Sequence, residues 1–179
     1  REGKFETAAE HKPDYLRISQ AERERAEKEK NAKPEVRGMT IEDGAAVAEM
    51  EHQSFSDAWS EKAVLETLRQ PTALCLVAEK AGRRVGYLLA YQAADEIEIA
   101  RVAVVEEVKR QGVGTALMKK LQEEGTQRKA RKILLDVREK NHMAQAFYEK
   151  IGFKEDGIRK RFYTEPEEDA VLMSMQISG

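Results

Sequence analysis

The stretch Val102-Ala-Val-Val-Glu-Glu-Val-Lys-Arg-Gln-Gly-Val-Gly-Thr-Ala-Leu117 carries the most informative change of pattern in this chain. It opens with β-branched residues and passes through a short charged segment to two glycines. Ala116, Leu117, Met118 and Leu121 then follow at helical spacing. Because the apolar period changes from that of a strand to that of a helix, the stretch predicts a strand, a tight loop and a helix.

The loop in this stretch combines two glycines with two cations. Gly112 and Gly114 can adopt positive φ and let a ligand come close to the backbone. At the start of a helix several N–H groups point to one place, where the helix dipole also favours negative charge. Lys109 and Arg110 add positive charge, so we predict a pyrophosphate-binding loop. A glycine-rich turn without a ligand is the alternative, and the glycine pattern is not that of a P-loop or a dinucleotide motif.

The strand that leads into this loop changes phase. Ile97 and Ile99 are apolar at odd positions, whereas Val102 and Val104 are apolar at even positions. Side chains alternate between the faces of a strand, so one extra residue near Ala100-Arg101 predicts a β-bulge. A strand buried on both faces is the alternative.

Periodicity and turn residues predict seven strands and four helices after the N-terminal segment. The strands are expected over 36–39, 74–79, 85–92, 96–105, 132–137, 153–161 and 170–176, and the helices over 40–52, 60–70, 114–128 and 141–151. This order predicts one α/β domain with a mixed, mostly antiparallel sheet. We expect the first helix to bury Ile41, Ala45, Ala48 and Met50.

Composition argues against several classes of protein. A chain of 179 residues with 41% hydrophobic residues can build one core with an appendage. The net charge of −2 argues against a general nucleic-acid-binding domain, and no apolar run approaches the roughly 18 residues of a membrane span. The histidines lack metal-ligand spacing, so no metal site is expected. The single cysteine, Cys75, permits no internal disulfide, which fits a soluble cytoplasmic protein.

Three stretches together resemble one family. They are Lys109-Arg-Gln-Gly-Val-Gly114, Asp136-Val-Arg-Glu-Lys-Asn141 and Ala144-Gln-Ala-Phe-Tyr-Glu-Lys-Ile-Gly-Phe153, and the family is that of the GNAT N-acetyltransferases, over residues 35–179. The resemblance implies the GNAT fold, a seven-stranded sheet flanked by helices with a β-bulge in the fourth strand. It also implies acetyl-CoA as the co-substrate.

Within this family the chain is most similar to the RimI branch. That similarity rests on Trp59-Ser-Glu61, Leu135-Asp-Val-Arg138 and Ile158-Arg-Lys-Arg-Phe-Tyr163. Members of the branch acetylate the N-terminal alanine of ribosomal protein eighteen of the small subunit. The resemblance therefore implies that the acceptor is the N-terminal peptide of a ribosomal protein.

The resemblance also assigns the residues that bind the co-substrate. Backbone groups of Val102, Ala103 and Val104 would hold the acetyl and pantetheine part, in the manner of an added strand. Asn141 would hydrogen-bond it from the start of a helix. The pyrophosphate loop would comprise Lys109, Arg110, Gln111, Gly112, Val113, Gly114 and Thr115.

The same resemblance makes Tyr148 the general acid for the leaving thiolate and Asp136 the general base. The RimI branch has Glu where this chain has Asp136, so the carboxylate is one methylene shorter, and Glu98 and Glu106 are other candidate bases. An α-amine has a pKa of about 7.7–8.0 and is partly neutral already, so it tolerates a base that is short or acts through water. The alternatives are that Tyr148 only packs in the core and that Asp136 is a solvated strand end.

A basic cluster lies next to two aromatic residues near the C-terminus. Arg159, Lys160 and Arg161 precede Phe162 and Tyr163, and they form either a wall beside the substrate or a solvated strand end. A cationic wall suits a basic ribosomal N-terminus poorly. Acidic residues on the first helix could supply the attraction instead: Glu42, Asp43, Glu49 and Glu51.

Residues 1–34 differ in character from the domain expected over 35–179. From Ser19 to Lys33 nearly every residue is Ala, Glu, Arg, Lys or Gln, so we expect a solvated helix or a disordered tail whose removal changes stability little. Within residues 1–30, Pro13-Asp-Tyr-Leu-Arg-Ile-Ser-Gln-Ala-Glu-Arg23 resembles the end of TsaB, a protein of tRNA threonylcarbamoyl-adenosine synthesis. That resemblance implies a fusion, or an association with the tRNA-modification complex.

The leading hypothesis is direct acetyl transfer from acetyl-CoA to a protein N-terminus, with no covalent enzyme intermediate, metal, nucleic acid or membrane involved. One alternative is a GNAT enzyme that acts on a small amine or a lysine side chain. Another is a non-catalytic acetyl-CoA-binding module linked to tRNA modification.

Overall fold

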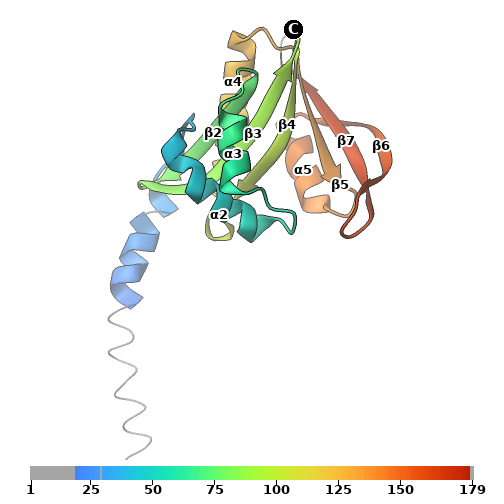
Figure 1. Cartoon of the computed structure of the whole chain (residues 1–179). Coiled ribbons are helices and arrows are strands. Elements are labelled where there is room, and N and C mark those ends of the chain that lie inside the picture. Colours follow the sequence, from blue (N-terminus) through green and yellow to red (C-terminus); the bar gives the residue numbers. More distant parts are fainter. Residues whose placement is uncertain (1–18, 29, 178–179) are drawn as a thin grey trace, which may run out of the picture.

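The computed structural model describes residues 19–28 and 30–177, and its elements follow the predicted order (Figure 1). They are β1 (Glu35–Gly38), the short helix η1 (Ile41–Asp43), α2 (Gly44–Ser54), α3 (Glu61–Leu68), β2 (Ala73–Lys80), β3 (Arg83–Ala93), β4 (Glu96–Val104), η2 (Glu106–Val108), α4 (Val113–Gln127), β5 (Lys132–Arg138), α5 (His142–Ile151), β6 (Lys154–Tyr163) and β7 (Glu168–Gln176). The strand and helix boundaries lie within a few residues of those predicted.

The seven strands of the described residues form one mixed sheet in the order β1-β2-β3-β4-β5-β7-β6. Only β4 and β5 run parallel, and the other neighbours are antiparallel. The predicted α/β class with a mostly antiparallel sheet is therefore confirmed.

Helices cover opposite faces of this sheet. Tyr87 on β3 contacts Glu51 of α2, whereas a side chain at the neighbouring Gly86 would meet Val113 and Leu117 of α4. Adjacent residues of a strand point to opposite faces. Hence α2 and α3 lie on one face, which we call the α2/α3 face, and α4 lies on the other.

The parallel strands β4 and β5 pair over only part of their length. Their register extends from Glu96 opposite Lys132 to Glu98 opposite Leu134 and then ends. Figure 1 shows the two strands together at one end and separating toward the other. The second half of β4 therefore has a free edge on the side of β5.

The predicted β-bulge is present in β4. Ile99 pairs with Ala90 and Arg101 pairs with Leu89, so Ala100 has no partner in the register. Ile97 and Ile99 point into the buried core with α4. The extra residue turns Arg101 to the α2/α3 face, and this position would otherwise face the same way as Ile99.

The buried stripe of α2 differs from the prediction. Ile41 is 65% exposed and Ala45 is exposed, whereas Val47, which was not predicted, is buried. The expected burial of Met50 is confirmed. Gly44 packs so closely on α3 that a Cβ there would lie 2.8 Å from Cδ2 of Leu65. The helix is thus rotated relative to the stripe that counting apolar residues predicts.

Two buried carboxylates explain this rotation. Asp43 lies fully buried just before α2 and forms ion pairs with Arg37 at 2.7 Å and Arg84 at 2.6 Å. Glu51 lies later in α2, is also fully buried and pairs with Arg101 at 2.8 Å. Paired charges can be buried where an apolar pattern predicts exposure. Asp43 and Glu51 are consequently not available to attract a substrate, and only Glu42 and Glu49 of the four acidic candidates are exposed.

The N-terminal part that the structure describes is helical over 19–28, with exposed side chains over 20–28. Figure 1 shows this helix projecting away from the sheet. The buried Lys80 donates from Nζ to the carbonyl oxygen of Lys30 at 3.2 Å. Most of the stretch that resembles TsaB lies outside the described residues. No helix in the described part of the chain is long and apolar enough to cross a membrane.

Candidate active site

The predicted pyrophosphate loop has a backbone suited to an anion. Arg110 and Gly112 adopt left-handed φ values of 68° and 84°, and α4 begins directly after them without a side-chain cap. Hydrogen bonds within the turn use the N–H groups of Lys109 and Gln111. Five N–H groups of the loop and first helical turn have no backbone partner among residues 19–28 and 30–177, namely those of Arg110, Gly112, Val113, Gly114 and Thr115.

The two glycines of the loop serve different purposes. A Cβ on Gly112 would meet no atom of the described residues within 4 Å, so its left-handed φ and an approaching ligand are what restrict this position. A Cβ on Gly114 would lie 2.9 Å from Cζ of Phe147. Gly114 therefore lets α4 approach α5, a packing reason that the sequence analysis did not give.

The side chains of the loop are partly engaged with each other. Lys109 forms an ion pair with Glu106 at 2.7 Å. The amide of Gln111 accepts a hydrogen bond from the buried Lys80 and donates to the carbonyl of Glu107. Gln111 thus supports the loop from inside, while Arg110 and Thr115 are exposed.

The free edge of β4 offers hydrogen bonds from alternate residues. The N–H of Val105 donates to the carbonyl of Val85, so in this antiparallel pair Ala103 also directs its backbone groups to β3. The backbone groups of Val102 and Val104 then point to the free edge. Of Val102, Ala103 and Val104, Ala103 is therefore the residue whose backbone groups are already hydrogen-bonded to β3.

Asn141 occupies the N-cap of α5. Its side-chain oxygen accepts a hydrogen bond from the N–H of Ala144 at 3.1 Å. Any hydrogen bond from Asn141 to a ligand must therefore come from its amide nitrogen, which has no partner among the described residues.

Tyr148 combines core packing with an open hydroxyl group. It is 9% exposed and makes edge contacts with Phe147 and Phe153, with ring centroids 5.4 and 5.6 Å apart. Its hydroxyl makes no hydrogen bond within the described part of the chain, yet no fully buried side-chain oxygen there lacks a partner. The hydroxyl therefore reaches open space. Burial, with the nearby Tyr163, raises the pKa of Tyr148 to about 12.

Asp136 is half-buried on β5, and its carboxylate has no hydrogen-bond partner among the described residues. Burial raises the pKa of Asp136, and the charge of Arg159 opposes that rise. By the β4–β5 register, Asp136 faces the same side of the sheet as Glu98, which is the α2/α3 face. It is thus a carboxylate with a free proton-accepting oxygen beside the gap between β4 and β5.

Tyr163 interacts electrostatically with both Asp136 and Tyr148. The sequence analysis placed it only next to the basic cluster. Burial and then the negative charge of Asp136 raise the pKa of Tyr163 to about 12. Tyr163 in turn contributes to the raised pKa of Tyr148. Asp136 and Tyr148 therefore both lie within electrostatic reach of one phenol group.

The other candidate bases, Glu106 and Glu98, are placed less favourably than Asp136 for removing a proton from the acceptor. The side chain of Glu106 is 83% exposed and paired with Lys109, beside the pyrophosphate loop. Glu98 is exposed and sits opposite Leu134, one step along the α2/α3 face from Asp136.

The basic cluster is partly neutralised. Lys160 pairs with Asp169 at 3.1 Å and Arg161 with Glu167 at 3.2 Å. Arg159 lies over the ring of Phe162, 5.1 Å from its centroid. Opposite charges on and just before β7 thus reduce the positive field that the sequence predicts for this wall.

A second cluster, which sequence reasoning missed, surrounds Glu51. Its carboxylate accepts hydrogen bonds from Arg101, from the hydroxyl of Tyr87 and from the N–H of Trp59. The guanidinium of Arg101 lies 4.1 Å from the ring centroid of Phe55. The signal in the sequence is a single arginine at the bulge, between the apolar pairs Ile97/Ile99 and Val102/Val104.

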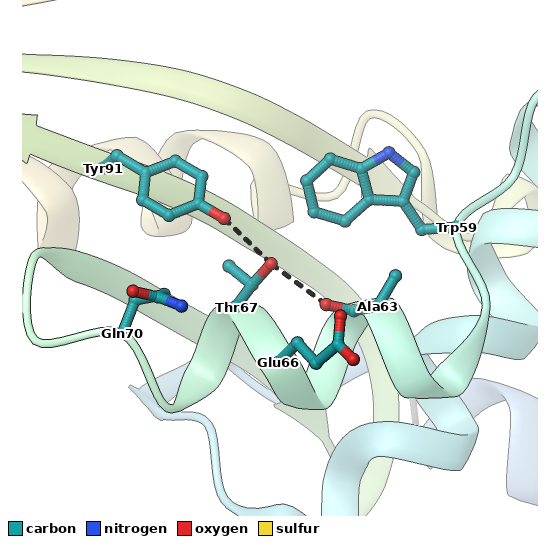
Figure 2. A pocket seen from close by; sticks show the side chains of 6 residues that line it. All are labelled: Trp59, Ala63, Glu66, Thr67, Gln70 and Tyr91. Atoms are coloured by element: carbon teal, nitrogen blue, oxygen red, sulfur yellow. Dashed lines mark hydrogen bonds between the residues drawn. The ribbon is translucent and has the colours of Figure 1, made fainter.

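An open cavity of about 320 Å³ lies between α3 and β3 (Figure 2). It is lined by Trp59, Ala63, Glu66, Thr67, Gln70 and Tyr91. The hydroxyl of Tyr91 donates to that of Thr67, which donates to the carbonyl of Ala63. None of the predicted site residues lines this cavity.

The loop, the free edge of β4 and the residues Asp136 and Tyr148 are the parts of the structure that the sequence analysis assigned to acetyl transfer from acetyl-CoA. The chain belongs to the acetyltransferase (GNAT) family, whose model matches residues 44–153. Enzymes of this family are N-acetyltransferases that use acetyl-CoA.

Individual relatives narrow the resemblance. A Bacillus subtilis protein, provisionally named a ribosomal protein bS18-alanine N-acetyltransferase, is 37% identical over 82% of this chain and 97% of its own length. The enzyme of that name from Escherichia coli K12 is 31% identical over 74% of this chain and 90% of its length. The crystal structure of the Escherichia coli ribosomal-protein-S18-alanine N-acetyltransferase superposes with a TM-score of 0.75 at 29% identity, covering 82% of this chain and 96% of that one.

Proposed function

We propose that this chain transfers the acetyl group of acetyl-CoA directly to the N-terminal α-amine of a protein, with the N-terminal alanine of ribosomal protein bS18 as the acceptor. The names of relatives that are 31% and 37% identical support this acceptor. The observation that supports the chemistry is the half-buried carboxylate of Asp136, which lies on β5 beside the gap between β4 and β5 and has no hydrogen-bond partner among the described residues. The hydroxyl of Tyr148 on α5, which reaches open space, complements it.

The binding residues fit the two ends of acetyl-CoA. The N–H groups of Arg110 and of Gly112 to Thr115 would receive the pyrophosphate oxygens, since they have no backbone partner among the described residues and lie at the start of α4. The outward backbone groups of Val102 and Val104 would hold the pantetheine amides along the free edge of β4. Bound there, acetyl-CoA supplies a thioester whose carbonyl carbon accepts the amine and whose sulfur leaves.

Asp136 would remove the proton from the acceptor amine. Acetyl transfer requires a neutral amine, and an α-amine with a pKa of about 7.7–8.0 is partly neutral at physiological pH. Burial strengthens Asp136 as a base because it raises the pKa of the carboxyl group. The shorter side chain can act directly or through one water molecule.

Tyr148 would donate the proton that the leaving sulfur needs. With a pKa of about 12, its hydroxyl is protonated throughout the physiological range, and a thiolate has a pKa of about 8.5. The new N–C bond forms as the C–S bond breaks. The amine proton passes to Asp136, and the tyrosine proton passes to the sulfur.

Mass spectrometry of two matched peptides tests this function. One peptide begins with the alanine of bS18, and the other has the same sequence with a blocked N-terminus and a free lysine. We expect acetylation of the first peptide alone in the presence of acetyl-CoA. Acetylation of the lysine, or of neither peptide, would overturn the proposal.

A further inference from the structure

We propose that Arg101 recognises the first peptide carbonyl group of the acceptor and so restricts acetylation to amines with a carbonyl next to the carbon that bears them. The proposal rests on the proposed function, because only a peptide N-terminus offers that group. It assigns a specificity-determining role to a residue in the Glu51 cluster.

The position of Arg101 is the first support. It directly precedes Val102, whose backbone lies on the free edge of β4, and the bulge turns its side chain to the α2/α3 face. Asp136 faces the same side of the sheet from β5. Arg101 and Asp136 both influence the pKa of Tyr163, in opposite directions. These three side chains therefore lie near one another where β4 and β5 separate, and we place the acceptor amine there.

The guanidinium of Arg101 is held firmly in place. Its Nε and Nη2 contact the carboxylate of Glu51 at 3.0 and 2.8 Å, and the rings of Phe55 and Trp59 lie 4.1 and 5.5 Å away. The side chain is 13% exposed. A group fixed on several sides binds a ligand with little loss of side-chain entropy.

Arg101 nevertheless keeps hydrogen-bond donors for a ligand. Nε and Nη2 contact Glu51, and Nη2 also contacts Asp57 at 3.4 Å. Nη1 has no hydrogen bond to any residue in the described part of the chain. Since each guanidinium carries five N–H donors and no acceptor, the two on Nη1 suit a carbonyl oxygen and not an amine.

The chemistry of the acceptor explains the selectivity. In a peptide N-terminus the carbonyl carbon is bonded to the carbon that carries the amine, so one rigid unit presents both groups. In a lysine side chain four methylenes separate the amine from the backbone. Only the first kind of acceptor can place its amine at Asp136 and a carbonyl at Arg101 together.

The test compares two peptides that differ at the first peptide bond. The first begins with alanine, and the second carries an (E)-alkene in place of that bond, which removes the carbonyl and the N–H but keeps the shape. Because the alkene also changes the pKa of the amine, the deciding quantity is the change in the ratio of the two rates between wild type and Arg101→Lys. We expect wild type to favour the first in kcat/KM by about 10- to 100-fold, the worth of a hydrogen bond to a charged group. In Arg101→Lys this ratio should fall toward one, with the alkene peptide little affected.

Equal use of both peptides by wild type, or an unchanged ratio in Arg101→Lys, would overturn the role of Arg101. A purely structural role would lower both rates together. If Arg101→Lys does not fold, Glu51→Gln with Arg101→Gln gives a neutral pair of side chains that can still hydrogen-bond, and the same ratio should collapse. If wild type binds acetyl-CoA but acetylates neither peptide, the proposed function itself fails.

Discussion

Gly114 at the start of α4 lies directly against Phe147 of α5, with room for no Cβ between them. Gly114→Ala should therefore lower the melting temperature of the free protein by about 2–4 °C, the shift that about 1 kcal/mol produces in a domain of this size. Differential scanning calorimetry measures this directly. Adding Phe147→Leu should restore part of the loss, because the smaller side chain makes room, and an unchanged melting temperature in Gly114→Ala would refute the packing argument.

Gly112 should respond differently, because a Cβ there would have no atom of residues 19–28 or 30–177 within 4 Å. Acetyl-CoA should raise the melting temperature of wild type, as a ligand of the native state does. Gly112→Val places a side chain where the pyrophosphate would lie, so we expect this stabilisation by acetyl-CoA to disappear. Persistence of the full shift in Gly112→Val would remove the loop from the binding site.

The buried Asp43 predicts sensitivity to acid. Its ion pairs with Arg37 and Arg84 hold the pKa of its carboxyl group well below the usual value. A lowered pKa in the folded state adds stability that is present above the unfolded pKa, about 3.9, and is lost as the pH falls below it. Urea midpoints should therefore fall more steeply below about pH 4 in wild type than in Asp43→Asn. Parallel curves would show that Asp43 does not contribute.

The buried carboxylates of Asp43 and Glu51 show which features of the fold the sequence predicts and which it does not. Local periodicity predicts the order of the elements, and the shift of phase after Ile99 predicts the bulge, because both depend on neighbours in the chain. The face of α2 depends instead on Arg84 and Arg101, which lie far along the chain from Asp43 and Glu51. A single sequence does not show such pairings, so the acidic residues of α2 looked solvent-exposed.

The same distinction applies to the candidate site: some of its residues follow from local sequence patterns, and others are placed by the tertiary structure. Loop glycines and the helix after them are a local pattern, and motif resemblance adds Tyr148 and Asp136. Arg101 faces the same side of the sheet as Asp136 because the bulge rotates its side chain, and Tyr163 interacts with Asp136 because β7 pairs with both β5 and β6. Their contribution therefore depends on the tertiary structure.

Two truncations test the N-terminal segment. Sequence alone predicts that removing residues 1–33 changes stability little, but the buried Lys80 hydrogen-bonds to the carbonyl of Lys30. We expect removal of residues 1–27 to leave the melting temperature nearly unchanged. Removal of residues 1–33 should lower it by about 2–4 °C, because a buried ammonium group loses an acceptor. Lys80→Met in the shorter chain should recover the difference, and equal melting temperatures for the two truncations would show that this contact adds no stability.

The final prediction separates the acid from the base. Tyr148→Phe keeps the edge contacts with Phe147 and Phe153 but removes the donated proton. The rate constant should fall by about 10²- to 10⁴-fold, the usual worth of a positioned general acid, with acetyl-CoA affinity little changed. Stopped-flow measurement of thiol release, with calorimetric binding of acetyl-CoA, distinguishes these two effects.

Asp136→Asn should cost less than Tyr148→Phe with an alanine peptide, because part of the α-amine is neutral without a base. The deficit should shrink as the pH rises past the pKa of the amine, since solvent then supplies the neutral form that Asp136 otherwise provides. Glu98→Gln is the matched control on the same face of the sheet and should retain activity. If Glu98→Gln is inactive while Asp136→Asn is unaffected, the base lies one step along the sheet from Asp136. Full activity in Tyr148→Phe would leave Tyr148 with core packing alone.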